Sequence, residues 1–239
     1  MSDIDDPRRA FLIQALSAGF YASGLAGILR PAWGMGKVPG ILPPGKSIYD
    51  MAGQVRVNGK PANKDTFIGP QSLVETGANS HVIFAVEKDA FILRSHSRVE
   101  IKGNQIIQSL RLLSGKILSV FGQRHKNQSL GLRTINATIG VRGTGVYMET
   151  NPDQSYVCTC YGTADLAAIK DNASHERVVT THHDSPRYIL SAGLSGQLIR
   201  PASVIDHTDD ELALIEALVG RTVPFAFDGG YGAARNISY

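Results

Sequence analysis

Short stretches in which apolar and polar residues alternate recur along the chain from residue 54 onward. In 54–58, Val55 and Val57 alternate with polar neighbours, which is the period-two pattern of a half-buried strand. Similar runs follow at 66–68, 73–75, 82–86, 91–94, 98–101, 105–113, 116–121, 132–137, 139–148, 156–161, 165–169, 177–181 and 188–190. Turn residues such as Asn58-Gly59 separate them. The pattern predicts an all-β fold, a sandwich or roll of many short strands.

One helix is predicted near the C-terminus, over residues 209–219. Thr208 and Glu211 have the spacing of a capping box, in which each side chain accepts a hydrogen bond from a backbone N–H. Apolar residues then recur on one face at helical spacing, and Gly220 follows as a stop signal. We expect this C-terminal helix to pack on the sheet and to be followed by a loose tail.

The chain divides by composition into four segments. Residues 1–34 have the character of an export signal, and 35–52 form a linker rich in proline and glycine. A β-rich domain follows at 53–150, and 151–239 form a β extension that carries the helix. The sequence leaves open whether this extension is a separate domain or continues the same sheets.

The N-terminal segment begins with a charged pair and continues as an apolar run. Arg8 and Arg9 are followed by Phe11 and Leu12, and no further charge occurs before Arg30. The segment resembles a twin-arginine translocation signal, an address read by a receptor. The resemblance implies export of an already folded protein from a bacterial cytoplasm to the periplasm, with the twin-arginine translocase as partner. The alternatives are an uncleaved anchor facing the periplasm in the inner membrane and a buried N-terminal helix.

Composition narrows the classes of partner. With 43% hydrophobic residues, the 239-residue chain can bury a core. Lys and Arg number 24 against 21 Asp and Glu, and this net charge of +3 is too small to predict nucleic-acid binding. The 2 cysteines exclude a disulfide-rich scaffold and a four-cysteine zinc module.

A more specific motif closes the first β-rich segment. The pattern T-x-x-A-x-x-x-V-R-G-T is formed by Thr134, Ala137, Val141, Arg142, Gly143 and Thr144. Glycine and strand signals extend around it over residues 53–150. With these features the segment resembles the FecR domain, the periplasmic β-rich domain of bacterial iron-dicitrate-type regulators.

The resemblance implies a role in relaying a signal from an outer-membrane receptor toward a sigma factor. Because only ten residues precede the apolar run, we do not expect direct control of a sigma factor. We expect an exported periplasmic module for binding or signalling that recognises a ligand or an envelope protein partner. The Arg142-Gly143-Thr144 turn has two possible roles, a structural bend or bulge and a ligand contact.

Catalytic motifs find little support in the sequence. The segment Gly193-Leu-Ser195-Gly196 departs from the G-x-S-x-G pattern of a nucleophile elbow. Asp209 and Asp210 are explained by their place at the start of a helix. We therefore expect no enzymatic activity and no required cofactor.

The most distinctive chemical feature is a pair of cysteines one residue apart. In a strand, Cys158 and Cys160 project from the same face, so their thiols would lie side by side. Buried inert thiols, a redox-active disulfide and a site for copper or zinc all remain open. A metal ion would need further donors, for which His182 and His183 are candidates and His207 is also available. The alternative function is therefore a metal-binding or redox protein, exported in the folded state.

Overall fold

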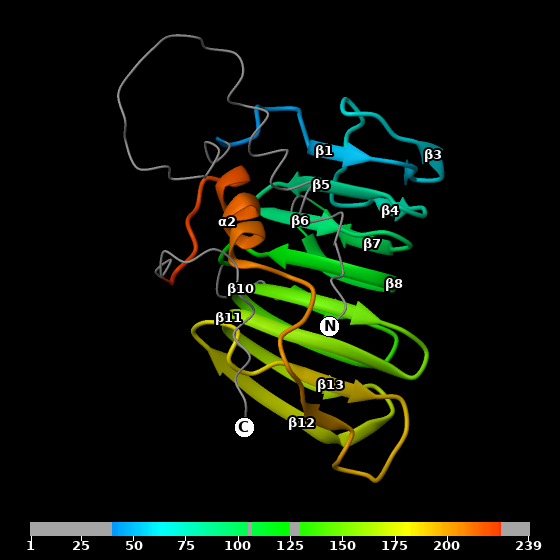
Figure 1. Ribbon diagram of the computed structural model, residues 1–239, viewed down its shortest axis with the longest axis vertical. Helices are drawn as coiled ribbons and strands as arrows, with labels where there is room; N and C mark the ends of the chain where they lie inside the picture. The colour runs from blue at the N-terminus through cyan, green and yellow to red at the C-terminus, as the bar shows by residue number, and fades with distance from the viewer. Residues whose placement is uncertain (1–39, 105–106, 125–129, 226–239) are drawn as a thin grey trace, which may run out of the picture. The chain divides into compact units, whose positions relative to one another are not determined.

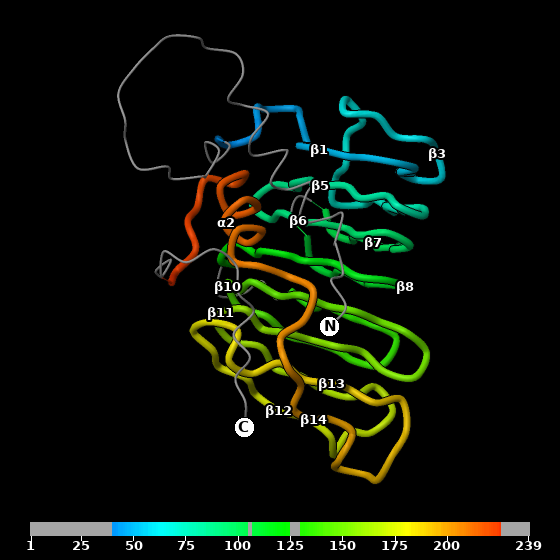
Figure 2. Tube along the Cα trace, in the orientation of Figure 1, coloured from blue at the N-terminus to red at the C-terminus, as the bar shows by residue number. Residues whose placement is uncertain are grey.

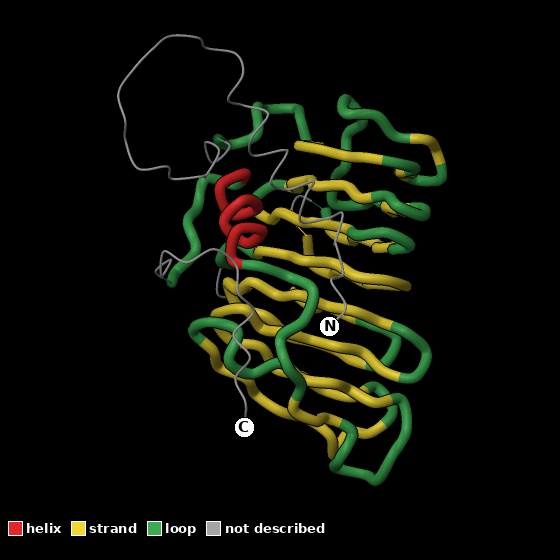
Figure 3. The backbone as a smooth tube through the Cα atoms, viewed as in Figure 1, coloured by secondary structure: helices red, strands yellow, loops and turns green. Residues whose placement is uncertain are grey.

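The computed structural model describes residues 40–104, 107–124 and 130–225. In this part of the chain, strands predominate and α2 (Asp209–Leu218) is the one helix (Figure 3). The strands are β1 (Ile48–Ala52), β2 (Val55–Val57), β3 (Lys60–Pro61), β4 (Leu73–Thr76), β5 (His81–Val86), β6 (Asp89–Leu93), β7 (Arg98–Gly103), β8 (Ile107–Val120), β9 (Leu130–Arg133), β10 (Ala137–Thr150), β11 (Gln154–Ala168), β12 (Asp171–Thr180), β13 (Arg187–Leu190) and β14 (Ile199–Pro201). All of them belong to one 14-stranded sheet, so the all-β prediction is confirmed.

The strands are joined mainly by antiparallel pairing. The longest path through the sheet runs β14-β13-β11-β10-β9-β8-β7-β4-β2-β3, and β1, β5, β6 and β12 pair off this path. Figure 2 traces the early strands in blue and cyan at one end of the stack and the late strands in yellow and orange at the other. Because β10 and β11 pair from Ala137 to Ala168, the residues after 150 continue the same sheet.

Three long strands change partners part way along. Strand β8 pairs first with β7 and β9 and then with β6 and β10, while β10 pairs first with β9 and then with β8. Strand β11 pairs first with β13 and then with β12. A glycine with positive φ stands at each change of partner, namely Gly115, Gly143 and Gly162. These bends fold the single sheet into two layers.

The main hydrophobic core lies between the two layers. Its residues come from both, for example Val99 and Leu132 from one layer and Phe91 and Val157 from the other. Phe91 also stacks on Phe84, with ring centroids 4.9 Å apart. The predicted sandwich or roll is thus built from one bent sheet, with its apolar side chains buried between the layers.

A second buried row crosses the outer face of the layer that contains β5, β6 and β13. Successive cross-strand partners in this row are Ile83, Ile92, Leu118, Tyr147 and Cys158. Helix α2 packs on β5, β6 and β8 at this face (Figure 1). The row therefore runs from beneath the helix to the cysteine pair.

Helix α2 follows its sequence signals closely. The capping box between Thr208 and Glu211 is present, and Leu212, Ile215 and Leu218 are buried. The helix ends at Leu218 with Val219 as its C-cap. A buried ion pair fixes its first turn to the sheet, because Arg94 Nη2 lies 2.8 Å from Glu211 Oε1.

Two stretches differ from the sequence expectation. Residues 66–68, predicted as a strand, lie in a loop in which the Ile68 N–H donates to Ser47 Oγ. Ile68 is buried nonetheless, so a loop that covers the core has a strand-like hydrophobic pattern. Residues 48–52, expected to end the linker, form β1 and pair with β5. The sequence does not predict this strand, because Ile48 is its one buried residue and the strand has no alternation of buried and exposed positions.

The expected export signal at 1–34, with Arg8, Arg9, Phe11 and Leu12, lies outside the described residues, as do the last fourteen residues of the tail. In the part that the structure describes, no helix has the length and apolar character needed to cross a bilayer.

Candidate metal centre and adjoining cavity

Strand β11 brings both cysteines to the outer face of the sheet. Val146 of β10 pairs with Thr159, whereas its neighbour Gly145 pairs with Tyr161, so β11 bulges at Cys160. Cys158 and Cys160 are free thiols, and both have 0% of their surface exposed. Their sulfur atoms lie within 4.8 Å of each other, although the bulge interrupts the regular alternation on which the sequence argument relied.

Two histidines reach these thiols from separate segments. His183 lies in the bend after β12, where its backbone N–H donates to the Cys160 carbonyl and its Nδ1 lies 3.7 Å from Cys158 Sγ. His207 precedes the capping box of α2 and stacks on Tyr147, with ring centroids 4.5 Å apart. One donor atom from each of Cys158, Cys160, His183 and His207 lies within 4.8 Å of all the others. We call these four residues the inner cluster.

The outer nitrogens of both rings are already engaged. His183 Nε2 lies 3.0 Å from Asp209 Oδ1, and His207 Nδ1 lies 2.6 Å from the Ile205 carbonyl oxygen. A carboxylate and a carbonyl only accept hydrogen bonds, so each of these ring nitrogens carries its proton. The other two nitrogens, His183 Nδ1 and His207 Nε2, face each other at 2.9 Å. Two neutral rings would present lone pairs to each other here, so this contact requires either a proton on one ring or a metal ion between the two nitrogens.

The surroundings of the inner cluster shift the pKa values of its two thiols in opposite directions. The hydrogen bond from Cys160, together with those of His183 and His207, lowers the pKa of Cys158 well below its ordinary value despite burial. Burial and the neighbouring Cys158 raise the pKa of Cys160. Burial opposes the charged form of His183, but Asp209 and Cys158 still raise the pKa of His183 to about 9. One thiolate can therefore form readily here.

His182 lies outside the inner cluster, although the sequence grouped it with His183. Its Nε2 lies 2.9 Å from both carboxylate oxygens of Asp209, and 41% of its side chain is exposed. Of these two neighbouring rings, only that of His183 reaches the thiols. His182, His183 and Asp209 form a second group of potential metal ligands.

Two residues of this region were not assigned to it from the sequence. His207 was recognised as a donor but not placed beside the cysteines, and Asp209 was attributed to helix capping alone. His207 lies 47 residues from Cys160 along the chain. Only the docking of α2 on the sheet brings His207 and Asp209 to the cysteine pair, and no local spacing predicts that docking.

The FecR-like motif has a structural place in the sheet. The Ala137 N–H donates to Thr134 Oγ1 at 3.0 Å, so these two residues close the turn into β10. Val141 is buried, whereas Arg142 is exposed and contributes after Arg177 to lowering the pKa of Asp165. At the bend of β10, Gly143 has a φ of 57° and Thr144 is fully buried.

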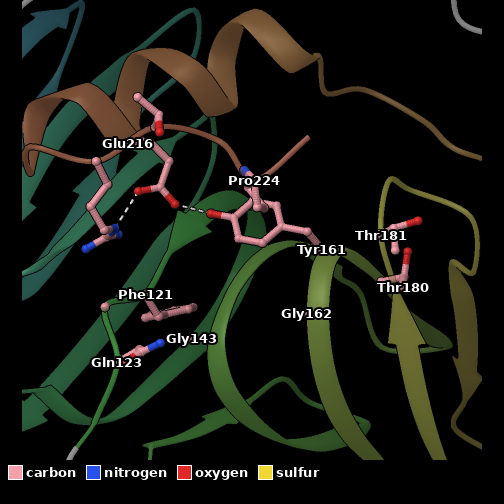
Figure 4. Close-up of a pocket in the computed structure, with 12 residues that line it drawn as sticks. Phe121, Gln123, Gly143, Tyr161, Gly162, Thr180, Thr181, Glu216 and Pro224 are labelled. Carbon is pink, nitrogen blue, oxygen red and sulfur yellow. Dashed lines mark hydrogen bonds and ion pairs between the residues drawn. The ribbon is translucent and has the colours of Figure 1, made fainter. Parts of the chain in front are cut away.

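A cavity of about 370 Å³ adjoins this bend. Gly143 and Gly162 line it together with Tyr161 and with Glu216 of α2. Figure 4 shows the Tyr161 ring directed toward Glu216, whose carboxylate accepts the Tyr161 hydroxyl hydrogen bond and pairs with Arg221 Nε at 2.6 Å. Glu216 is only 3% exposed, so its charge is largely satisfied within the protein.

Comparisons with known proteins do not assign the chain to a family. No protein-family model matches it, and no curated protein matches it. Two crystal structures, determined at 1.65 and 2.50 Å and described as a "putative anti-sigma factor" from Parabacteroides distasonis, have partly similar folds. Their TM-scores are 0.44 and 0.45, at 10% sequence identity. The similar region covers 54% of this chain and 58% of each of those chains.

Proposed function

We propose that this protein binds a metal ion through Cys158, Cys160, His183 and His207. The observation that carries the proposal is the facing of two imidazole nitrogens at 2.9 Å, with their outer nitrogens already donating to fixed acceptors. A metal ion satisfies both lone pairs at once, and two thiols complete a four-donor set. An outer carboxylate or carbonyl that orients a histidine is the usual second layer of a metal site.

The distances support tetrahedral coordination. Zinc–sulfur bonds of about 2.3 Å and zinc–nitrogen bonds of about 2.0 Å imply edges of about 3.5 Å for S–N and about 3.3 Å for N–N. Cys158 Sγ and His183 Nδ1 are 3.7 Å apart, close to the first value. The two imidazole nitrogens at 2.9 Å would separate by about 0.4 Å to admit the ion.

Charge favours a divalent ion in this buried place. Two thiolates and two neutral imidazoles carry a charge of about −2, which a zinc-like ion cancels and copper(I) would only halve. Uncompensated charge is costly where both sulfurs have no exposed surface. Zinc is therefore the favoured ion, and copper(I) is the second choice on ligand softness.

A proton is the competing occupant of the same position. If His183 is protonated, its Nδ1–H donates to His207 Nε2, and the 2.9 Å contact is an ordinary hydrogen bond.

Metal analysis distinguishes the two occupants. The protein is purified without chelator from bacteria grown with added zinc or copper, and its metal content is measured. The proposal expects about one ion per chain in the wild type.

The double variant Cys158→Ser/Cys160→Ser should lose the ion, whereas His175→Gln, at an exposed histidine on β12, should keep it. A folded wild-type protein that takes up neither zinc nor copper(I) when both are supplied in excess would show that the position holds a proton.

A second candidate function is supported by the FecR-like motif. We propose that the chain is also an exported, non-catalytic module of the periplasm that recognises a ligand or an envelope partner in signalling. The supporting observation is that Gly143 of the motif lines the cavity beside the bend of β10. Metal binding and recognition are compatible, because the inner cluster and the cavity use different residues.

The export step of this second function is tested by cell fractionation. Replacement of Arg8 and Arg9 by lysine keeps the charge but removes the twin-arginine motif, so the protein should accumulate in the cytoplasm. The replacement Arg30→Lys, outside the pair, serves as the matched control. Periplasmic delivery of the double variant at the wild-type level would contradict a twin-arginine route.

A further inference from the structure

The inner cluster is closed to solvent on its sulfur side. Cys158 and Cys160 have 0% exposed surface and His207 has 8%. The His183 side chain is 11% exposed, whereas those of Asp209 and His182 are 34% and 41% exposed. Exposure of the donor groups therefore rises in one direction, from the thiols through His183 to Asp209 and His182.

The exposed pair is physically continuous with the inner cluster. The Asp209 carboxylate contacts His182 Nε2 at 2.9 Å and His183 Nε2 at 3.0 Å, and thus bridges the two rings. His183 belongs to both groups of potential ligands, since its Nδ1 faces the thiols and its Nε2 faces Asp209. An ion held by His182 and Asp209 would be one imidazole ring away from its final ligands.

We propose that His182 and Asp209 form an entry site, which captures a divalent metal ion from solvent and passes it to the inner cluster. This inference rests on the proposed metal-binding function and adds a loading step to it. An exposed carboxylate and imidazole exchange ligands quickly with hydrated ions, and the carboxylate supplies local negative charge. The inner thiolates are softer and bind zinc-like ions more tightly, so the affinity increases inward.

Two neighbouring rings position the His182 side chain beside His183. Its ring packs against Phe225, with centroids 4.3 Å apart, and lies 5.0 Å from the His183 ring. His183 adopts a φ of 51°, in the left-handed region, and the two neighbouring rings meet edge to face. The His183 ring reaches the Cys158 thiol, while the His182 ring stays near solvent.

Loading must also release protons to solvent. As the ion reaches the inner cluster, it displaces the protons of the thiols and any proton shared between His183 and His207. Each proton lost is replaced by a bond from sulfur or nitrogen to the metal, so no oxidant or other reactant is needed.

The test compares loading rates with final affinities. The full-length metal-free protein is mixed rapidly with zinc or with cobalt(II), whose absorbance reports tetrahedral thiolate ligation. The variant His182→Gln keeps a polar side chain but loses the imidazole. We expect its association rate to fall about tenfold, because the entry site keeps the Asp209 carboxylate but loses its imidazole donor. Its stoichiometry and affinity at equilibrium should remain those of the wild type.

The matched control is His175→Gln, the same substitution at an exposed histidine on β12. It should load at the wild-type rate. An unchanged rate in His182→Gln overturns the entry site while leaving the metal-binding function intact. Loss of equilibrium affinity in that variant also overturns it, because His182 would then be a final ligand. Absence of metal binding by the wild-type protein is a different result and counts against the proposed function itself.

Discussion

At the residue scale, the geometry of the inner cluster depends on the contacts that the two ring nitrogens of His183 make. His183 Nε2 is fixed by Asp209, which leaves Nδ1 directed at His207 and Cys158. Although burial opposes it, His183 and His182 lower the pKa of Asp209, so the carboxylate stays charged. A charged partner makes His183 a more basic ligand and fixes its tautomer.

Asp209→Asn is therefore expected to weaken zinc affinity about 10- to 100-fold, the usual cost of losing a second-layer carboxylate. Competition with a chelator of known affinity measures the change. Asp210→Asn is the matched control, because Asp210 neighbours Asp209 in the first turn of α2 but belongs to neither group of potential ligands. Equal affinities in the two variants would mean that Asp209 does not orient His183.

A second residue-scale prediction concerns the bend of β11. A Cβ at Gly162 would lie 2.5 Å from Thr144 Cγ2, and the φ of Gly162 is +92°. At Gly59 the φ is +77°, but nothing lies within 4 Å of the added atom. Gly162→Ala should therefore cost more free energy of unfolding than Gly59→Ala, which carries only the backbone cost of about 1 kcal/mol. Urea unfolding of both variants checks this, and equal costs would remove the steric role of the Thr144 contact.

The sequence alone predicts some of the residues of the inner cluster and misses others. The alternation of strand side chains predicts Cys158 and Cys160 side by side, but it does not predict the bulge at Cys160. The sequence also names His183 as a candidate donor, but only together with His182. The position of His207 depends on where α2 docks, and Asp209 has a sufficient local explanation as a capping residue, so neither is assigned to the cluster.

At the element scale, local sequence signals determine where α2 forms, and one buried ion pair helps to attach it to the sheet. Its capping box and apolar face are local, which is why the sequence locates the helix to within a residue at its C-terminal end. Its attachment to the sheet is not local in sequence, because Arg94 of the segment after β6 contacts both Glu211 and the Asp206 carbonyl.

The sequence predicts two short strands in place of each of the long strands β8 and β11. The reason is that Gly115 and Gly162 interrupt the alternation where these strands bend.

The ion pair yields a stability prediction. Arg94 and Glu211 are 6% and 4% exposed, so Arg94→Met would leave a buried carboxylate without its cation. Breaking such a pair typically costs 3–5 kcal/mol, roughly the loss we expect in the free energy of unfolding. The double variant Arg94→Met/Glu211→Gln, which removes both charges, should recover much of it. A single variant as stable as the wild type in chemical denaturation would show that the pair contributes little.

At the scale of the whole described sheet, the inner cluster joins segments that are distant in sequence. Cys158 and Cys160 lie in β11, His183 follows β12, and His207 leads into α2. The chain brings these segments together by bending three long strands at glycines, a property of tertiary packing that no short sequence window contains. A metal ion at this point would act as a cross-link between the sheet and the segment that begins α2.

Bound zinc should accordingly stabilise the fold. A ligand that binds only the native state adds about 2.7 kcal/mol when its free concentration is 100 times its dissociation constant. The midpoint of thermal unfolding should therefore rise when zinc is added to the metal-free protein and fall again with chelator. The variant Cys158→Ser/Cys160→Ser should show no such rise, because hydroxyls at these positions are poor zinc ligands. A rise of the same size in that variant would mean that zinc stabilises the protein elsewhere, for example through the exposed His182 and Asp209 alone.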